Sequence, residues 1–100
     1  MTFLTYDLAQ TTPDPHGPII DALLPRGWYR WSIGDFVDHK SKLPNTTLEG
    51  EFVDLDTAQR SFDAAILAVR AQGITLNVRK WLIVEYVRCR FYSDELLPLD

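Results

Sequence analysis

The chain has 100 residues, of which 46% are hydrophobic and 24% are charged, and its formal net charge is −4. This length is typical of one domain, and the composition is that of a folded chain rather than a disordered one. The acidic balance argues against a protein that coats nucleic acid regardless of sequence, because such proteins gain affinity from a basic excess that neutralises phosphates. A local basic patch is not excluded.

Cysteine content and hydropathy indicate the cellular location of the protein. Cys89 is the single cysteine, so an intramolecular disulfide is impossible and a cysteine-based zinc site is not expected. No stretch approaches the roughly 20 apolar residues of a membrane span. The first residues lack the charged and apolar regions of a secretory signal. We therefore expect a cytoplasmic protein with no membrane-spanning segment.

The first quarter of the chain predicts a strand, a loop and a short helix. Residues 2–8 are rich in strand formers, and residues 9–18 are rich in proline and threonine, which is typical of a loop. Pro18 suits the first turn of a helix, and apolar residues at helical spacing follow it. Pro25 and Gly27 are helix-ending residues, so this helix should be about two turns long.

Two further strands are predicted before the middle of the chain. Residues 28–33 alternate in polarity, which indicates a second strand. Its apolar face is predicted to carry Tyr29, Trp31 and Ile33. Residues 34–45 form a long polar connection in which Asp35 and Asp38 are expected to be solvated, and residues 46–52 predict a third strand.

The segment after residue 55 is the clearest helix. Asp56 is the expected N-cap residue, with Gln59 three positions later as its capping-box partner. The apolar stripe expected to face the core is Ala58, Phe62, Ala65, Ile66 and Val69. Gly73 is a natural residue to follow the end of this helix.

The last part of the chain completes a recognisable plan. Residues 74–87 predict a long fourth strand, and residues 88–93 alternate as if they continue it or form an extra edge strand. The element order is therefore strand, helix, strand, strand, helix, strand. This order predicts an α+β, ferredoxin-like βαββαβ domain over residues 1–100, with a four-stranded antiparallel sheet and two helices on one face, to which an extra C-terminal strand can be added.

One face of such a sheet is not covered by helices. Exposed apolar side chains on it would require a partner. We therefore expect a homodimer that forms through this face or by edge pairing. Aromatic residues are common interface anchors, and the predicted interface residues are Trp31, Trp81 and Tyr86.

Asp7, at the end of the first strand, is the leading candidate for chemistry. A carboxylate at a strand end is either a catalytic or metal-binding ligand or a residue that caps the following turn. His16 in the next loop is a candidate general base, because histidine titrates near neutral pH, or simply an exposed loop residue. Asp7 is the candidate catalytic and metal-binding residue.

Basic residues are concentrated near the end of the chain. Residues 59–100 hold six of the ten basic side chains and five of the fourteen acidic ones. Basic residues among aromatic ones can bind phosphates and stack bases, or they can be solvated or paired with Glu85, Asp94 or Glu95. The predicted nucleic-acid contacts, to RNA or DNA, are Arg79, Lys80, Arg88 and Arg90. Arg88 and Arg90 are expected to share one face if the strand continues through them.

Two segments resemble a known group of proteins. Thr5-Tyr-Asp-Leu8, followed by a loop, a helix and Gly27-Trp-Tyr-Arg-Trp-Ser-Ile33, resembles the small CRISPR-associated adaptation nucleases and the related VapD-like toxins. The resemblance implies a dimeric ferredoxin-like protein in which Asp7 holds Mg²⁺ as a catalytic ligand. Mg²⁺ prefers oxygen ligands and assists phosphodiester hydrolysis. The chain differs from this group in its acidic charge and in Gly34, where the group has phenylalanine.

Three functions follow from these observations. The first is a small dimeric nucleic-acid-linked protein, either a Mg²⁺-dependent endonuclease or a degenerate relative of one. The second is a non-catalytic regulatory or inhibitory module that binds another protein. The third is a domain that binds a small ligand on the uncovered sheet face.

Overall fold

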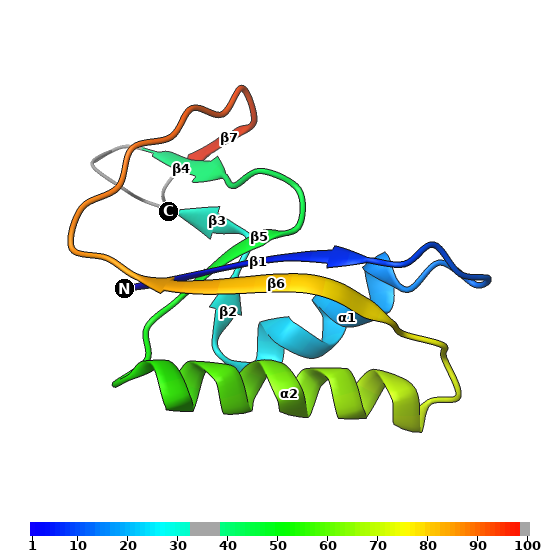
Figure 1. The fold of residues 1–100 in the computed structure, drawn as a ribbon. Coiled ribbons are helices and arrows are strands. Elements are labelled where there is room, and N and C mark those ends of the chain that lie inside the picture. Colours follow the sequence, from blue (N-terminus) through cyan, green and yellow to red (C-terminus); the bar gives the residue numbers. More distant parts are fainter. Residues whose placement is uncertain (33–38, 99–100) are drawn as a thin grey trace.

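The computed structural model describes residues 1–32 and 39–98. In chain order the elements are β1 (Thr2–Leu8), α1 (His16–Leu23), the 3₁₀ turn η1 (Leu24–Arg26), β2 (Trp28–Tyr29), β3 (Trp31–Ser32), β4 (His39–Lys42), β5 (Thr47–Gly50), α2 (Leu55–Ala71), β6 (Val78–Glu85) and β7 (Leu96–Pro98) (Figure 1). Asp35 and Asp38 lie outside the described residues, as does Ile33. Within these ranges, no helix combines the length and apolarity needed to cross a membrane.

Four strands form an antiparallel sheet in the order β2-β5-β1-β6. β1 is central, and its Leu4 lies opposite Leu48 of β5 and Ile83 of β6. Helices α1 and α2 contact each other and lie together beneath the sheet (Figure 1). The predicted α+β class, with a four-stranded antiparallel sheet and two helices, is confirmed.

Alternation along β1 determines what each face of the sheet carries. Leu4, Tyr6 and Leu8 are buried, and they belong to one hydrophobic core with residues of both helices. Because successive strand residues point to opposite faces, Phe3 and Asp7 point to the other face. The sheet therefore has one helix-covered face and one face without helices.

Helix α2 begins two residues earlier than the predicted cap implies. The N-cap is Asp54, whose carboxylate accepts the backbone N–H of Thr57 at 2.7 Å, so the prediction of Asp56 is wrong. A hydrogen bond with the Thr57 side chain, and then the one with its backbone N–H, lower the pKa of Asp54. The predicted apolar stripe is confirmed, since Ala58, Phe62, Ala65 and Val69 are buried.

The predicted second strand is divided at Arg30. Its first part, β2, pairs with β5, and its second part, β3, pairs with β4 in another sheet. The predicted apolar face is wrong at the start of this segment, because Trp28 is fully buried and Tyr29 is 54% exposed. Both residues are aromatic, so alternation alone did not indicate which of them faces the helices.

Trp28 is buried by a close fit between three elements. It lies opposite Gly50, and its ring centroid is 4.7 Å from that of Phe52. A Cβ atom at Gly50 would clash with the Phe52 ring and with the Gly27 carbonyl oxygen, so this position needs glycine. The indole Nε1 donates to Ser61 Oγ at 3.1 Å, which in turn donates to the Arg26 carbonyl at 2.8 Å. The β2 end of the sheet is thus joined to α2.

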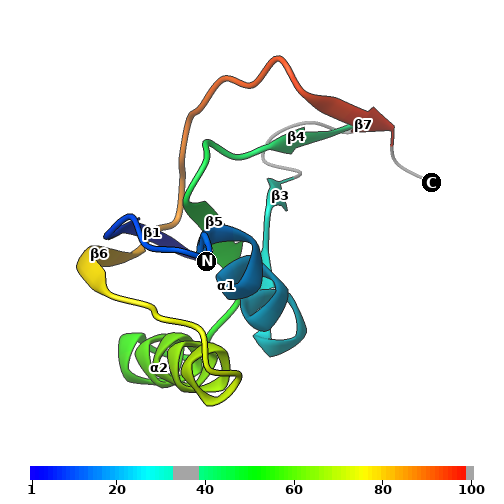
Figure 2. The ribbon, with the colours of Figure 1, turned by 90° about the vertical axis from the view of Figure 1, so that its right-hand side faces the viewer.

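A second, smaller sheet has the order β3-β4-β7. Figure 2 shows it on the side of the main sheet that is away from the helices. β7 is an extra C-terminal strand, as predicted, but it consists of residues 96–98 and pairs with β4 of the same chain. The Lys42 ammonium lies 3.3 Å from the Glu95 carboxylate beside this pairing.

β6 is shorter than predicted at both ends. It covers Val78–Glu85, whereas residues 74–87 were predicted. The segment before β6 is not part of a strand and is attached to α2 instead. The Arg70 guanidinium donates twice to the Leu76 carbonyl, at 2.8 and 3.1 Å. Residues 86–95 are irregular, so the prediction of a strand at 88–93 is wrong.

Candidate functional site

Asp7 is exposed at the end of β1, on the face without helices. Its cross-strand neighbour is Lys80, and the register shifts by one residue between Asp7 and Leu8. The residues that the structure describes contain no group of three or more acidic, histidine or cysteine side chains placed to hold a metal ion. The positive charge of a lysine opposite the carboxylate opposes the binding of a cation there. The metal-ligand role of Asp7 stays a prediction.

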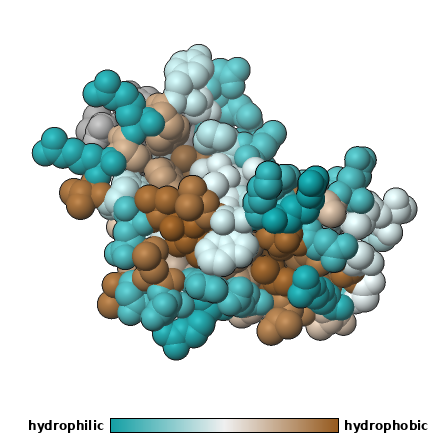
Figure 3. All heavy atoms as spheres, viewed as in Figure 1, coloured by the Kyte–Doolittle hydropathy of each residue, from teal (hydrophilic) through white to brown (hydrophobic). Residues whose placement is uncertain are grey.

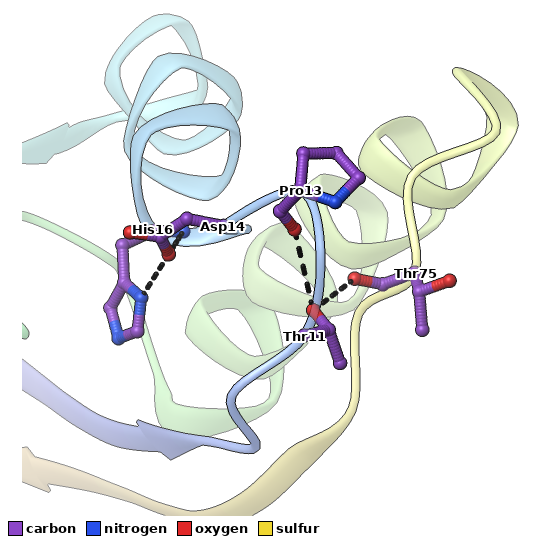
Figure 4. Close-up of polar contacts among 5 residues, drawn as sticks. All are labelled: Thr11, Pro13, Asp14, His16 and Thr75. Atoms are coloured by element: carbon purple, nitrogen blue, oxygen red, sulfur yellow. Dashed lines mark hydrogen bonds and ion pairs between the residues drawn. The ribbon is translucent and has the colours of Figure 1, made fainter.

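The loop after β1 contains an aspartate–histidine pair (Figure 4). Asp14 Oδ1 accepts the backbone N–H of His16 at 3.0 Å and lies 2.6 Å from His16 Nδ1. The backbone hydrogen bond and then the side-chain one lower the pKa of Asp14. The carboxylate therefore orients the imidazole at the start of α1. Both side chains are largely exposed, so this pair resembles a helix-start contact more than an enclosed catalytic dyad.

Hydrogen bonds join the same loop to the segment that precedes β6. The Thr11 hydroxyl lies 3.2 Å from the Thr75 carbonyl and 3.4 Å from that of Pro13 (Figure 4). The Ala9 N–H donates to the Asn77 carbonyl at 2.9 Å. These contacts hold the end of β1 and the start of β6 side by side.

The four predicted nucleic-acid contacts do not form one patch. Arg79 and Lys80 are at the start of β6, whereas Arg88 and Arg90 follow its other end (Figure 1). β6 spans about 25 Å. The expectation that Arg88 and Arg90 share one strand face is wrong, because the strand has ended at Glu85. All four side chains are exposed, and none forms an ion pair with another described residue.

Tyr86, a predicted interface residue, is used within the chain. Its ring stacks on Phe3 with centroids 4.2 Å apart, and its hydroxyl donates to the carboxylate of Glu49. Burial, and then the hydrogen bond to Glu49, raise the pKa of Tyr86. Sequence reasoning did not single out Glu49, which is buried. Its alternation with Leu48 placed it on the face without helices, but the side chains that cover it come from distant segments.

The two predicted interface tryptophans differ in exposure. Trp31 is half-buried in β3. Trp81 of β6 is 46% exposed and meets the Phe62 ring edge-on, with centroids 6.2 Å apart. Trp81 is therefore supported from below by α2 and open on its other side.

The outer edge of β6 is the most distinctive surface. β6 is a terminal strand of its sheet, and no described residue pairs with its outer edge. The Tyr86 N–H donates to the Met1 carbonyl at 3.0 Å, so the backbone groups of Tyr86 point toward β1. Because backbone groups alternate in direction along an antiparallel strand, those of Trp81, Ile83 and Glu85 point outward.

The side chains along this edge are also apolar. Leu82 is 56% exposed and Val84 is 41% exposed on the face without helices, and Trp81 lies on the opposite face. Figure 3 shows hydrophobic side chains gathered across the middle of the molecule, over β6. A long, exposed apolar edge strand favours pairing with another strand. We call the outward backbone groups and side chains of residues 80–85 the β6 edge.

Comparisons with known proteins found no matching family model, no matching curated protein and no matching solved structure. The resemblance to the CRISPR-associated nucleases and VapD-like toxins therefore stays a prediction that rests on residues such as Tyr6 and Asp7. Function is inferred instead from the geometry of the β6 edge and of the basic residues.

Proposed function

We propose that this chain is a non-catalytic interaction module that binds an extended strand of a protein at the β6 edge. The observation that carries this proposal is an eight-residue edge strand with outward backbone groups and exposed apolar side chains. In strand addition, backbone hydrogen bonds supply affinity and alternate side chains supply specificity. The β6 edge offers both kinds of contact.

The rest of the sheet supports this use of β6. β1 pairs with β6 over its whole length, and α2 packs beneath it through Phe62 and Trp81. A binding strand built on a rigid scaffold needs little ordering when the partner arrives. We further propose that the sheet and its two helices are a ferredoxin-like unit, which the order β2-β5-β1-β6 supports, and that the module acts in the cytoplasm.

Amide mapping tests strand addition with peptides of random sequence. Extended peptides are selected from a random library against the folded chain, and the bound peptide is located from backbone amide NMR shifts. We expect the largest shifts at Trp81, Ile83 and Glu85, together with slower exchange of their N–H groups. A Glu85→Pro variant removes one outward N–H and should weaken the selected peptides. Shifts confined to other surfaces would contradict the proposal.

The nucleic-acid function is a second candidate. The observation that favours it is that Arg79, Lys80, Arg88 and Arg90 are all exposed and form no ion pair within the described residues. Glu95, one of the carboxylates expected to pair with them, instead pairs with Lys42. In this alternative, Asp7 binds Mg²⁺ and takes part in cleavage of RNA or DNA.

The test of this second candidate uses labelled single- and double-stranded RNA and DNA, with Mg²⁺ or with a chelator. Wild type is compared with Asp7→Asn. Cleavage that needs both the metal and Asp7 would establish the nuclease. Binding without cleavage, lost in Arg79→Ala or Arg88→Ala, would leave a nucleic-acid contact without catalysis.

A further inference from the structure

We propose that the strand which occupies the β6 edge is β6 of a second copy of this chain. The two strands run antiparallel about a two-fold axis that is perpendicular to the sheet and passes midway between the two copies of Leu82. This inference rests on the proposed strand addition and names the partner. Symmetric self-pairing suits an edge of this kind, because the same edge of each subunit then pairs the outward backbone groups of the other subunit.

Symmetry and the pleat limit the possible registers. Opposite residues of a continuous sheet must lie on the same face, and side chains alternate between faces along a strand. One residue of β6 must therefore lie directly opposite its own copy across the two-fold axis. Near the middle of β6 the residue that faces its own copy can be Trp81, Leu82 or Ile83.

Charge selects the Leu82 register. It places Arg79 opposite Glu85 of the partner subunit, and symmetry forms this pair twice. Arg79 lies at the register shift of the β1–β6 pairing, where it has no β1 partner, so its side chain approaches Glu85 from an irregular strand position. The Trp81 register places Arg79 opposite an isoleucine, and the Ile83 register places Glu85 opposite a tryptophan. Opposite charges across two strands stabilise their pairing, and a buried or mismatched charge opposes it. Arg79 and Glu85 are both exposed in the single chain and available for this contact.

Backbone geometry fits the same register. The outward groups of Trp81 meet those of Ile83 in the partner subunit, which forms a hydrogen-bonded pair on each side of the axis. Leu82 then faces its symmetry copy as a non-hydrogen-bonded pair, in which Cα atoms are about 4.5 Å apart. Val84 lies opposite Lys80 of the partner subunit, so its side chain packs along the lysine stem. The pairing covers part of the Leu82 and Val84 side chains, which the single chain leaves exposed.

The direction of the axis also determines the shape of the dimer. Because the axis is perpendicular to the sheet, both helix-covered faces lie on one side and both uncovered faces on the other. The two sheets become one continuous sheet. The two Asp7 side chains lie on the uncovered face. They are therefore on the same side of the dimer and well apart.

Cysteine cross-linking tests the register. Cα atoms at about 4.5 Å are within the range of a disulfide, so Leu82→Cys should form a covalent dimer under mild oxidation. Val84→Cys is the matched control, because its opposite residue is Lys80 and not itself. Mixed Val84→Cys and Lys80→Cys chains should cross-link to each other. Wild type, which retains Cys89, measures the background.

Charge exchange tests the same contact in solution. Arg79→Glu and Glu85→Arg each place like charges opposite one another twice. Each should raise the dimer dissociation constant by roughly two- to thirtyfold, as measured by sedimentation equilibrium. The double variant Arg79→Glu/Glu85→Arg should restore dimerisation. Circular dichroism of each variant checks that it is folded.

The outcomes separate this inference from the proposed function. A chain that stays monomeric at every concentration, while selected peptides still shift the Trp81 and Ile83 amides, would overturn self-pairing and leave strand addition in place. A monomer with no peptide binding at β6 would overturn both. A dimer in which Val84→Cys cross-links with itself and Leu82→Cys does not would overturn the register.

Discussion

The two edges of the main sheet are built very differently. β2, at one edge, has two residues, and the chain leaves that edge at Arg30 to enter the second sheet. β6, at the other edge, has eight residues and carries exposed leucine and valine side chains. Short edge strands and early departures from a sheet discourage unwanted pairing. The fold therefore closes one edge by itself and leaves the other available for a partner.

A tryptophan at each edge offers the largest test of this difference. Trp28→Ala removes a fully buried ring at the β2 edge and should lower the free energy of unfolding by about 3–5 kcal/mol. Trp81→Ala at the β6 edge should cost less than about 2 kcal/mol, because its ring is 46% exposed. Urea denaturation of both variants measures the difference. Equal losses would contradict the contrast between the two edges.

Tyr6, in the central strand β1 between the two edges, makes the free energy of unfolding depend on pH. Burial raises the pKa of Tyr6 to about 12, from 10.0. Between these pH values the unfolded chain releases the proton and the folded chain keeps it. Stability is therefore fully present below pH 10.0 and falls as pH rises through about 12, by roughly 3 kcal/mol in total.

Tyr6→Phe should remove this part of the alkaline loss and leave stability at neutral pH nearly unchanged. Tyr86→Phe is the matched comparison, because it removes the hydrogen bond to Glu49 and should already be destabilising at neutral pH. Urea titrations at neutral and alkaline pH distinguish the two variants. An unchanged alkaline profile in Tyr6→Phe would show that Tyr6 is not the group responsible.

Two glycines test how tightly the β2 edge is packed. Gly50→Ala should destabilise by about 1–3 kcal/mol, because its new methyl group would meet the Phe52 ring and the Gly27 carbonyl. Gly17→Ala, in α1, meets no atom within 4 Å and should be neutral or slightly stabilising. Thermal denaturation of the two variants checks this. A tolerated Gly50→Ala would mean that the β2 edge is looser than its contacts indicate.

The smallest effect on folding is expected at the β6 edge itself. Leu82→Lys changes an exposed side chain and should alter the free energy of unfolding of the monomer by no more than about 0.5 kcal/mol. It should nevertheless prevent dimerisation, since it places two lysines opposite each other at the axis. Sedimentation and urea denaturation of the same sample measure both effects. Loss of folding together with dimerisation would show that β6 needs its partner to be stable.

Local patterns in the chain predicted both helices and located the four strands of the main sheet, but not β4, which lies in the segment predicted as a connection. The stripe from Ala58 to Val69 repeats at the helical period, and Gly73 adopts the positive φ of 81° expected after a helix end. β1 was predicted with the bounds that the structure shows. These features depend on residues that are near one another in the sequence, so periodicity and end signals are sufficient to identify them.

Local sequence patterns predicted only part of the candidate site. Trp81 was predicted at an interface from its residue type and strand, and the structure places it at the β6 edge. Glu49 was missed, because its cover comes from Tyr86, which is distant in sequence. The predicted shared face of Arg88 and Arg90 failed because the strand ended before them.

The sequence by itself determined the element order and which residues of β1 and α2 share a face, because backbone geometry gives strands and helices fixed periods. Tertiary structure decided which side of β2 is buried, where the chain divides at Arg30 and which strand is left at the edge. Those outcomes depend on strand order and on the fit of Trp28 over Gly50. Contacts between distant segments, and not local periodicity, therefore produced the β6 edge.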